Sequence, residues 1–347
     1  MYKDTRLLGA EKWYYISSER ANMRIPEEIK KVVCFLCVRE ANGNYQSYGT
    51  GFFVGVHLED WDFLYFVTAK HLLDDAKDNG YEKIYLRLNK KNGGIDYVEL
   101  NTDAWFHFEE EPIDLTLIGV AILPSDFDYS AIPIENLASN ETIQEHNIGL
   151  GDDLFMVGLF TKRKGRSQNI PIIRTGIISA MPDEPFLDEF GDEYNAYLAE
   201  VRSIGGLSGS PVFVYIDKNR TINPNLPEGI DWKHSLIGLI RGHWELDDEQ
   251  KDSSFIMDAP PRLNDGEKLN TGIAKVTPSQ FILRKLNDPS LQKARVEWVR
   301  MKEKDNEDVL DSSLQKAENE FSSKDFQNAL KLASRKISEP VSEKKET

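Results

Sequence analysis

Cysteine, positive charge and long apolar runs are scarce in this sequence, and each scarcity excludes a class of protein. Only two of the 347 residues are cysteine, which argues against a disulfide-rich secreted scaffold and suggests a reducing compartment. Lys and Arg number 42 against 58 Asp and Glu, a formal net charge of −16, which argues against a nucleic-acid partner because phosphate binding requires a basic surface. No apolar run approaches the length of a membrane span. We therefore expect neither nucleic acid nor membrane as a partner.

The sequence also lacks several motifs that would indicate a location or a cofactor. Its first residues contain neither the apolar segment nor the cleavage site of a secretory signal, which predicts a cytoplasmic protein. No glycine-rich phosphate loop or metal-ligand cluster stands out, so we expect no cofactor and no metal. Cys34 and Cys37 have the spacing of a metal or redox pair, but residues 31–38 are typical of a buried strand, on which positions three apart face opposite sides. We interpret both cysteines as structural.

From residue 32 onward the chain changes to short β-type runs separated by Gly, Asn and Asp. A hydrophobic share of 40% is enough for a substantial core. The expected strands are residues 32–38, 51–56, 63–68, 83–88 and 115–122 in a first group, and 154–160, 170–173, 176–178, 197–201, 212–216 and 236–240 in a second. Many short strands and few long helical patterns predict an all-β protein with two units, each a barrel or a sandwich.

The two ends of the chain differ from these β units. After residue 286 the chain is charged and helix-prone, with apolar residues spaced near one helix face, and its last ten residues are polar enough to predict disorder. This extension could pack on the β units, recruit a partner protein or mediate self-association. The predicted organisation is an N-terminal segment (1–28), a first β unit (29–130), a second β unit with a closing helix (131–286) and a helical, partly disordered C-terminal extension (287–347).

One small-residue turn, residues 205–211, presents Ser208 shortly before an apolar strand. A serine hydroxyl becomes an effective nucleophile only with a base and an anion-binding pocket. Gly206 lets the backbone bend until the N–H groups of Gly206 and Ser208 point at one spot, as an oxyanion hole requires. The alternative is an ordinary loop before a strand.

Two upstream residues could serve Ser208. His71 ends the β-rich run 63–71, and a histidine at a strand end suits a general base with a pKa near neutrality. Asp114 stands at the head of an apolar strand, where a buried carboxylate is costly unless it is hydrogen-bonded, and orienting an imidazole N–H is one such use. The alternatives are a structural histidine and an aspartate that caps the start of a strand.

The order His71, Asp114, Ser208 is that of the chymotrypsin triad and differs from the orders in subtilisin and the α/β-hydrolases. Three segments resemble those of the trypsin-like (chymotrypsin-fold) serine peptidases. They are Thr68-Ala69-Lys70-His71 beside the family's Thr-Ala-x-His, Asp114-Leu115-Thr116-Leu117 beside Asp-Ile-Ala-Leu, and Gly206-Leu207-Ser208-Gly209-Ser210-Pro211 beside Gly-Asp-Ser-Gly-Gly-Pro. Weaker similarities extend the resemblance over residues 29–286.

This resemblance implies two six-stranded antiparallel β-barrels and a serine endopeptidase acting on protein or peptide substrates without a cofactor. Ser208 would be the nucleophile, His71 the base, Asp114 its orienting carboxylate, and the amides of Gly206 and Ser208 the oxyanion hole. The absence of the family's disulfides implies a bacterial-type, intracellular member. Leu207 replaces the aspartate that pairs with the new N-terminus of trypsin-type zymogens, which argues against that activation route.

Substrate preference is predicted from three residues near the expected primary pocket. Ser210 in place of the family's second glycine resembles glutamyl endopeptidases of the staphylococcal type. By the resemblance, Arg202 falls at the pocket base and Arg241 near its wall, with His243 slightly later. Two cations there would favour an acidic P1 side chain. Either arginine could instead pair with a surface carboxylate.

A second hypothesis from another class remains. The alternative is a latent or non-catalytic protease-like module that binds peptides and is regulated by its helical tail, through a protein partner that binds residues 287–347. An intact set of His71, Asp114 and Ser208 counts against a pure binder, which does not need all three groups.

Overall fold

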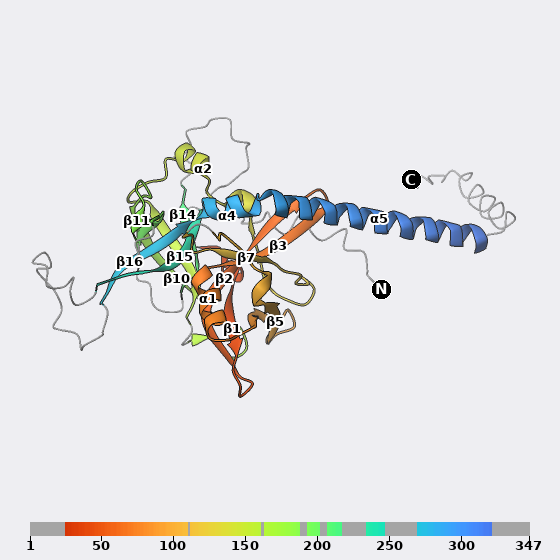
Figure 1. Ribbon diagram of the computed structural model, residues 1–347, viewed down its shortest axis with the longest axis horizontal. Coiled ribbons are helices and arrows are strands. Elements are labelled where there is room, and N and C mark those ends of the chain that lie inside the picture. The colour runs from red at the N-terminus through yellow and green to blue at the C-terminus, as the bar shows by residue number, and fades with distance from the viewer. Residues whose placement is uncertain are drawn as a thin grey trace, which may run out of the picture. The chain divides into compact units, whose positions relative to one another are not determined.

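Strands dominate the first of the two units into which the chain divides, Met1–Asp288 and Pro289–Thr347. The computed structural model describes residues 25–109, 112–160, 163–187, 193–201, 207–216, 234–246 and 269–320. Figure 1 shows the β strands of the first unit in two groups, one around β1, β2 and β3 and the other around β10, β14, β15 and β16.

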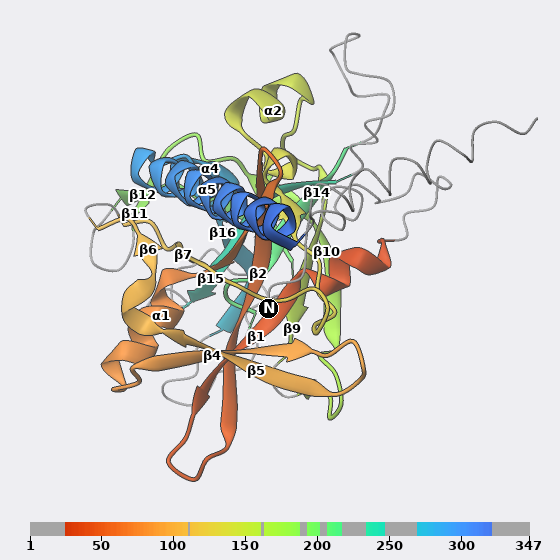
Figure 2. The same cartoon turned by 90° about the vertical axis from the view of Figure 1, so that its right-hand side faces the viewer.

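The N-terminal group is an eight-stranded sheet in the order β5-β4-β1-β2-β3-β7-β6, with β8 paired to β2. Its strands are β1 (Val33–Arg39), β2 (Tyr45–Leu58), β3 (Trp61–Thr68), β4 (Lys83–Asn89), β5 (Ile95–Asn101), β6 (Phe106–His107), β7 (Thr116–Gly119) and β8 (Ile132–Pro133). Figure 2 shows the β4–β5 hairpin beside β1. The pairs are antiparallel except for β2 with β8.

The closed first barrel that the resemblance implied is not confirmed. The described strands run in an open order from β5 to β6, and none of their pairings joins these two ends. Strand β6 has only two residues, both paired to β7, so it offers little backbone for a further ladder. The sheet nevertheless has its own core, which includes Phe53, Phe66, Leu86 and Trp105.

The second group is a closed six-stranded barrel, as expected for residues 131–286. Its order is β10-β13-β16-β15-β14-β9. The strands are β9 (Asp153–Leu159), β10 (Pro171–Ala180), β13 (Tyr197–Glu200), β14 (Pro211–Tyr215), β15 (His234–Leu246) and β16 (Leu269–Pro278), and a separate pair is formed by β11 (Phe186–Leu187) and β12 (Glu193–Tyr194). The expected strands 170–173 and 176–178 are one strand, β10, whose pairing to β9 continues through Arg174 and Thr175.

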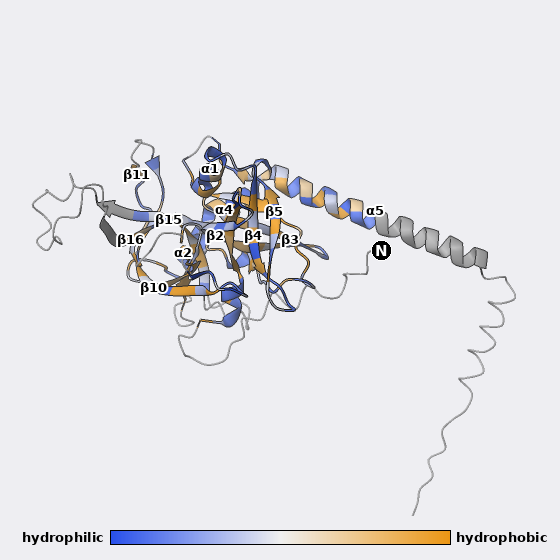
Figure 3. Cartoon of the chain, turned by 90° about the horizontal axis from the view of Figure 1, so that it is seen from below, coloured by the Kyte–Doolittle hydropathy of each residue, from blue (hydrophilic) through white to orange (hydrophobic). Residues whose placement is uncertain are grey.

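Alternation along the strands accounts for the cores. Met156 on β9, Val212 and Val214 on β14, and Val276 on β16 all point into the barrel core, as expected when every second side chain faces the same side. On β1, Cys34 belongs to the sheet core, whereas the Cys37 sulfur lies 3.2 Å from Ser47 Oγ. Figure 3 shows hydrophobic residues along the strands and hydrophilic residues on many of the loops that join them.

The helices of the first unit are short and occur mainly between strands. They are α1 (Lys70–Asp78), α2 (Asn140–Glu145), α4 (Ser279–Leu286) and the 3-10 helices η1 (Glu27–Lys31), η2 (Thr102–Ala104) and η3 (Ile134–Asn136). The closing helix expected after Thr277 is α4. The second unit contains α5 (Pro289–Glu320). Within the described part of the chain, every helix is too short or too polar to cross a bilayer.

Candidate active site

His71 lies in the first turn of α1, directly beyond the end of β3. The helix buries Leu72, Leu73 and Ala76, and this apolar face fixes how the helix packs. The N-terminal residue before the helix, Ala69, is extended and has no side chain that could cap the first turn. The backbone N–H of His71 is therefore one of the donors that a helix start leaves without an internal partner.

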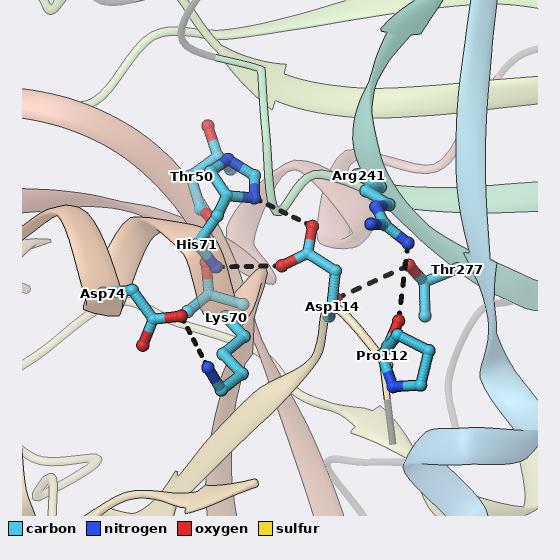
Figure 4. Close-up of polar contacts among 9 residues, drawn as sticks. Thr50, Lys70, His71, Asp74, Pro112, Asp114, Arg241 and Thr277 are labelled. Atoms are coloured by element: carbon cyan, nitrogen blue, oxygen red, sulfur yellow. Dashed lines mark hydrogen bonds and ion pairs between the residues drawn. The ribbon is translucent and has the colours of Figure 1, made fainter. Parts of the chain in front are cut away.

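Asp114 supplies that partner and also binds the imidazole (Figure 4). Its Oδ1 accepts from the His71 backbone N–H at 2.9 Å, and its Oδ2 lies 2.8 Å from His71 Nδ1. An ionised carboxylate can only accept, so Nδ1 carries the proton and Nε2 is left as the proton acceptor. The Asp114 side chain is 8% exposed and that of His71 38%, which keeps the carboxylate buried and the imidazole accessible.

Strand pairing explains why these residues, 43 positions apart, meet. Strands β3 and β7 are antiparallel, and Thr68 pairs with Thr116. The end of β3 and the start of β7 therefore lie side by side. His71 comes three residues after Thr68, and Asp114 comes two residues before Thr116. The sheet register thus places a base beside its carboxylate.

The contact shifts both pKa values. Burial disfavours the charged imidazolium, but the hydrogen bond to Asp114 and the charge of that carboxylate outweigh it and raise the pKa of His71. Burial likewise opposes the Asp114 carboxylate, but the hydrogen bond from His71 outweighs it and lowers the pKa of Asp114.

These opposite shifts set the pH range over which the pair stabilises the fold. The contribution from His71 is complete below its unfolded-state pKa and is lost as the pH rises through its raised folded-state pKa. The contribution from Asp114 is present above its unfolded-state pKa and is lost as the pH falls through its lowered folded-state pKa. The ion pair is therefore intact between the two folded-state pKa values.

Residues of the barrel hold the segment that carries Asp114. Thr277 Oγ1, at the end of β16, lies 3.5 Å from the Asp114 carbonyl oxygen, and Arg241 Nη1, on β15, lies 3.5 Å from the carbonyl oxygen of Pro112 (Figure 4). The Arg241 guanidinium also stacks over the Tyr194 ring, 3.9 Å from its centroid. A cation beside the carboxylate further lowers the pKa of Asp114.

Ser208 lies in a turn that packs on Thr50, within β2, and on Thr68, the last residue of β3. The backbone N–H of Thr50 donates to the Ser208 carbonyl oxygen at 3.1 Å, which links the turn to the N-terminal sheet. Gly209 has φ +81°, and a Cβ at this position would overlap the Thr50 carbonyl oxygen and Thr68 Oγ1. Only glycine fits so close an approach at this dihedral angle. Because Thr68 is three residues before His71, the serine turn and the histidine lie at the same junction.

The barrel supports the same turn from its other side. The Gly209 N–H donates to the Ile240 carbonyl oxygen at 2.8 Å, and the Ile240 N–H donates to the Ser210 carbonyl oxygen at 2.9 Å. Gly158 on β9 leaves room for the turn, since a Cβ there would lie 2.5 Å from Leu207 Cδ2 and 2.7 Å from Ser210 Oγ. The turn is therefore enclosed between the sheet and the barrel.

The predicted site residues are only partly brought together. His71 and Asp114 are bonded directly, but the hydrogen bonds of the described residues do not include one from the Ser208 hydroxyl to the His71 imidazole. Arg241 lies beside the pair, and His243 is half-buried on the same strand. Gly206 and Arg202 lie outside the described residues.

Sequence reasoning missed the residues that support this site. The supporting roles of Thr277, Tyr194 and Thr50 were not predicted, because they follow from contacts between distant strands. A signal for Thr50 was within reach, because it falls between Gly49 and Gly51 in a strand, and glycine within a strand can mark a close backbone approach.

Comparison with known proteins finds similarity in structure only. No family model matches the chain, and no curated protein matches it. Among solved structures, it is similar to Deg5 (15% identity, TM-score 0.36, 62% of this chain and 80% of that one) and to the active form of the Rv3671c protease from M. tuberculosis (14%, 0.39, 74% and 80%). It is also similar to the HtrA-type protease AlgW, solved with a decapeptide (13%, 0.39, 74% and 63%). Likeness at this level assigns no role to individual residues.

Proposed function

We propose that this protein is a serine endopeptidase in which Ser208, His71 and Asp114 act as a catalytic triad. The Ser208 oxygen bonds to a peptide carbonyl carbon while His71 Nε2 takes the hydroxyl proton, and the carbonyl oxygen becomes an oxyanion held by the amides of Gly206 and Ser208. The C–N bond then breaks as His71 returns the proton to the leaving amine. Water attacks the acyl-enzyme by the same route and restores the Ser208 hydroxyl.

The observation that carries the proposal is the His71–Asp114 pair, which is joined by two hydrogen bonds. A carboxylate that accepts from both the backbone N–H and Nδ1 fixes the ring's position and its tautomer. The raised pKa of His71 suits a base that must hold a proton during acyl transfer. The Ser208 turn is anchored to the sheet at Thr50, near the start of α1.

Arg241 supports the finer proposal of an acidic P1 preference. Its guanidinium stacks on Tyr194 and lies near the His71–Asp114 pair, and a stacked, pre-positioned guanidinium binds a carboxylate with little further ordering. We expect faster cleavage after Glu or Asp than after Lys, Phe or Ala. A peptide library in which Arg241→Gln and the parent chain share the same P1 profile would contradict this role.

Labelling by a fluorophosphonate probe tests the triad, and the chain offers two matched controls. We expect Ser208→Ala and His71→Ala to abolish labelling. Ser210→Ala removes a hydroxyl from the same turn, and His57→Ala removes a second histidine whose Nδ1 lies 2.8 Å from a carboxylate, that of Asp62. Both controls should label like the parent chain. Equal labelling of parent and Ser208→Ala would refute the assignment of the nucleophile.

The second candidate is a latent or non-catalytic peptide-binding module. The missing hydrogen bond between Ser208 and His71 among the described residues favours it, although such bonds are often long before substrate binds. A folded parent chain that resists labelling but binds peptides would support this candidate. Labelling that appears only after removal of residues 287–347 would indicate control by the tail. A protein partner for that tail and a cytoplasmic location both stay predictions.

A further inference from the structure

The loop between β9 and β10 gathers positive charge in a strongly acidic chain. Its described residues include Arg163, Lys164 and Arg166 within four positions, whereas the whole chain has a formal net charge of −16. The side chains of Arg163 and Arg166 are exposed, and that of Lys164 is half-buried. Such a local reversal of charge attracts anionic partners.

These three cations have no carboxylate partner among the described residues. Other lysines of the first unit do pair with carboxylates, namely Lys30, Lys31, Lys70, Lys77, Lys83 and Lys90. These lysines are neutralised within the fold, whereas the three cations of the loop are not. The charges of Arg163 and Arg166 are therefore available to a carboxylate from outside.

A buried arginine holds the loop in one conformation. Arg87 on β4 is 3% exposed, and its guanidinium donates to the carbonyl oxygens of Lys164 at 3.1 Å and Gly165 at 2.7 Å, and to Asn169 Oδ1. Asn169 in turn donates from Nδ2 to the Arg87 carbonyl oxygen at 2.7 Å, and its N–H donates to Asn89 Oδ1 at 2.7 Å. A loop fixed in this way can bind a ligand without first losing conformational freedom.

Arg87 also adds its own positive charge to this part of the loop. Among the described residues, the Arg87 guanidinium donates to the neutral oxygens of Lys164, Gly165 and Asn169, and no bonded anion there cancels its charge. That uncompensated charge adds to the positive field of the loop.

The loop begins beside the Ser208 turn. Leu159, the last residue of β9, donates its N–H to Thr50 Oγ1 at 3.2 Å, and the Thr50 N–H donates to the Ser208 carbonyl oxygen. Arg163 follows Leu159 by four residues, a chain length of at most about 14 Å. A peptide seated at Ser208 can therefore extend to the loop with a few further residues.

We propose that Arg163 and Arg166 form a cationic subsite, separate from the primary pocket, that binds acidic residues flanking the cleaved bond of a protein substrate. The inference rests on the proposed peptidase function for its substrate, but its charge recognition can be measured without turnover. The occupant is an acidic segment of a separate polypeptide.

Peptide binding tests the subsite in the full chain carrying Ser208→Ala, so that no peptide is consumed. Two fluorescent peptides share the same central residues, with Ala at P1, and differ only in a flank of four Glu or four Gln. We expect the Glu peptide to bind about fivefold more tightly by fluorescence anisotropy, an advantage typical of two exposed ion pairs. High salt should reduce it, because the Debye length falls to about 3 Å at 1 M.

Matched variants then locate the effect. Arg163→Gln with Arg166→Gln should reduce the advantage of the Glu peptide to less than about twofold. Lys90→Gln with Lys91→Gln removes the same charge from the β4–β5 turn and should leave the advantage intact. The proposal is overturned if the parent shows no preference, if the loop variant keeps it, or if the control loses it equally. It is also overturned if an oligothymidine binds as tightly as the Glu peptide and needs the same two arginines.

A labelling arm separates this proposal from the peptidase itself. With Ser208 intact, the loop variant should react with a fluorophosphonate at the parent's rate, because Arg163 and Arg166 are not part of the triad. Labelling without a loop-dependent preference refutes the subsite alone. A loop-dependent preference in a chain that never labels refutes the peptidase and supports the acidic-peptide surface.

Discussion

Substituting Gly209 with alanine should distort the Ser208 turn. The Cβ would overlap the Thr50 carbonyl oxygen and Thr68 Oγ1 and would lie 3.2 Å from the Thr50 carbonyl carbon. Neither neighbour can move easily, because both threonines are fully buried and the Thr68 hydroxyl donates to the Thr50 carbonyl oxygen at 2.8 Å. The turn itself must therefore move away from β2 and β3.

Two costs add up in this variant. Alanine at φ +81° costs about 1–2 kcal/mol, and overpacking a filled site costs about 1–3 kcal/mol more. We expect a loss of about 2–5 kcal/mol in the free energy of unfolding. A displacement of the Ser208 hydroxyl by about 1 Å should slow fluorophosphonate labelling by about 100-fold.

Gly93→Ala is the control that separates the two costs. Gly93 has φ +87°, but nothing lies within 4 Å of the Cβ that would be added. Both variants therefore carry the dihedral cost, and only Gly209→Ala carries the overlap. Urea unfolding measures the stability of each variant, and the probe measures the reactivity of Ser208. If the two variants are equally stable and label equally fast, the turn does not pack on Thr50 and Thr68 as described.

Three further predictions follow from the same contacts. Asp114→Asn should lower kcat/KM by about 10⁴-fold and shift its acid limb to lower pH, because the carboxylate that raises the pKa of His71 is lost; an unmoved limb in a pH–rate profile would contradict the pairing. Ser210→Ala should raise the free energy of unfolding in urea by about 1 kcal/mol, because the Ser210 hydroxyl is buried without a hydrogen-bond partner among the described residues; a decrease would reveal a partner. Arg87→Met should lower the free energy of unfolding by about 2–4 kcal/mol and speed tryptic cleavage after Arg163, because the β9–β10 loop loses its hydrogen bonds; unchanged cleavage would mean that Arg87 does not hold the loop.

Most strands could be predicted from the sequence because their apolar residues recur in short runs bounded by turn residues. The longest strands outside the predicted ranges are β5 and β16, and both carry charged or polar residues among few large apolar ones. Their pairing comes from the neighbours that they complete, β4 in the sheet and β13 with β15 in the barrel. Closure is a property of the whole set of strands, so the barrel around β9 and the open order around β1 could not be read from any one segment.

The sequence by itself determined the kinds of residue available for the candidate site and their order along the chain. His71 ends a β-rich run, Asp114 precedes an apolar one, and Ser208 stands in a small-residue turn. Each of these local features has an ordinary structural explanation when it is taken alone.

Only the tertiary structure decided that His71 meets Asp114 and that the Ser208 turn lies at the same junction. The first meeting depends on the register of β3 and β7, and the second on hydrogen bonds from Thr50 and to Ile240. These contacts join residues tens to more than a hundred positions apart. No local propensity determines them, because they form only when the sheet and the barrel bury their cores and bring distant strand ends to one place.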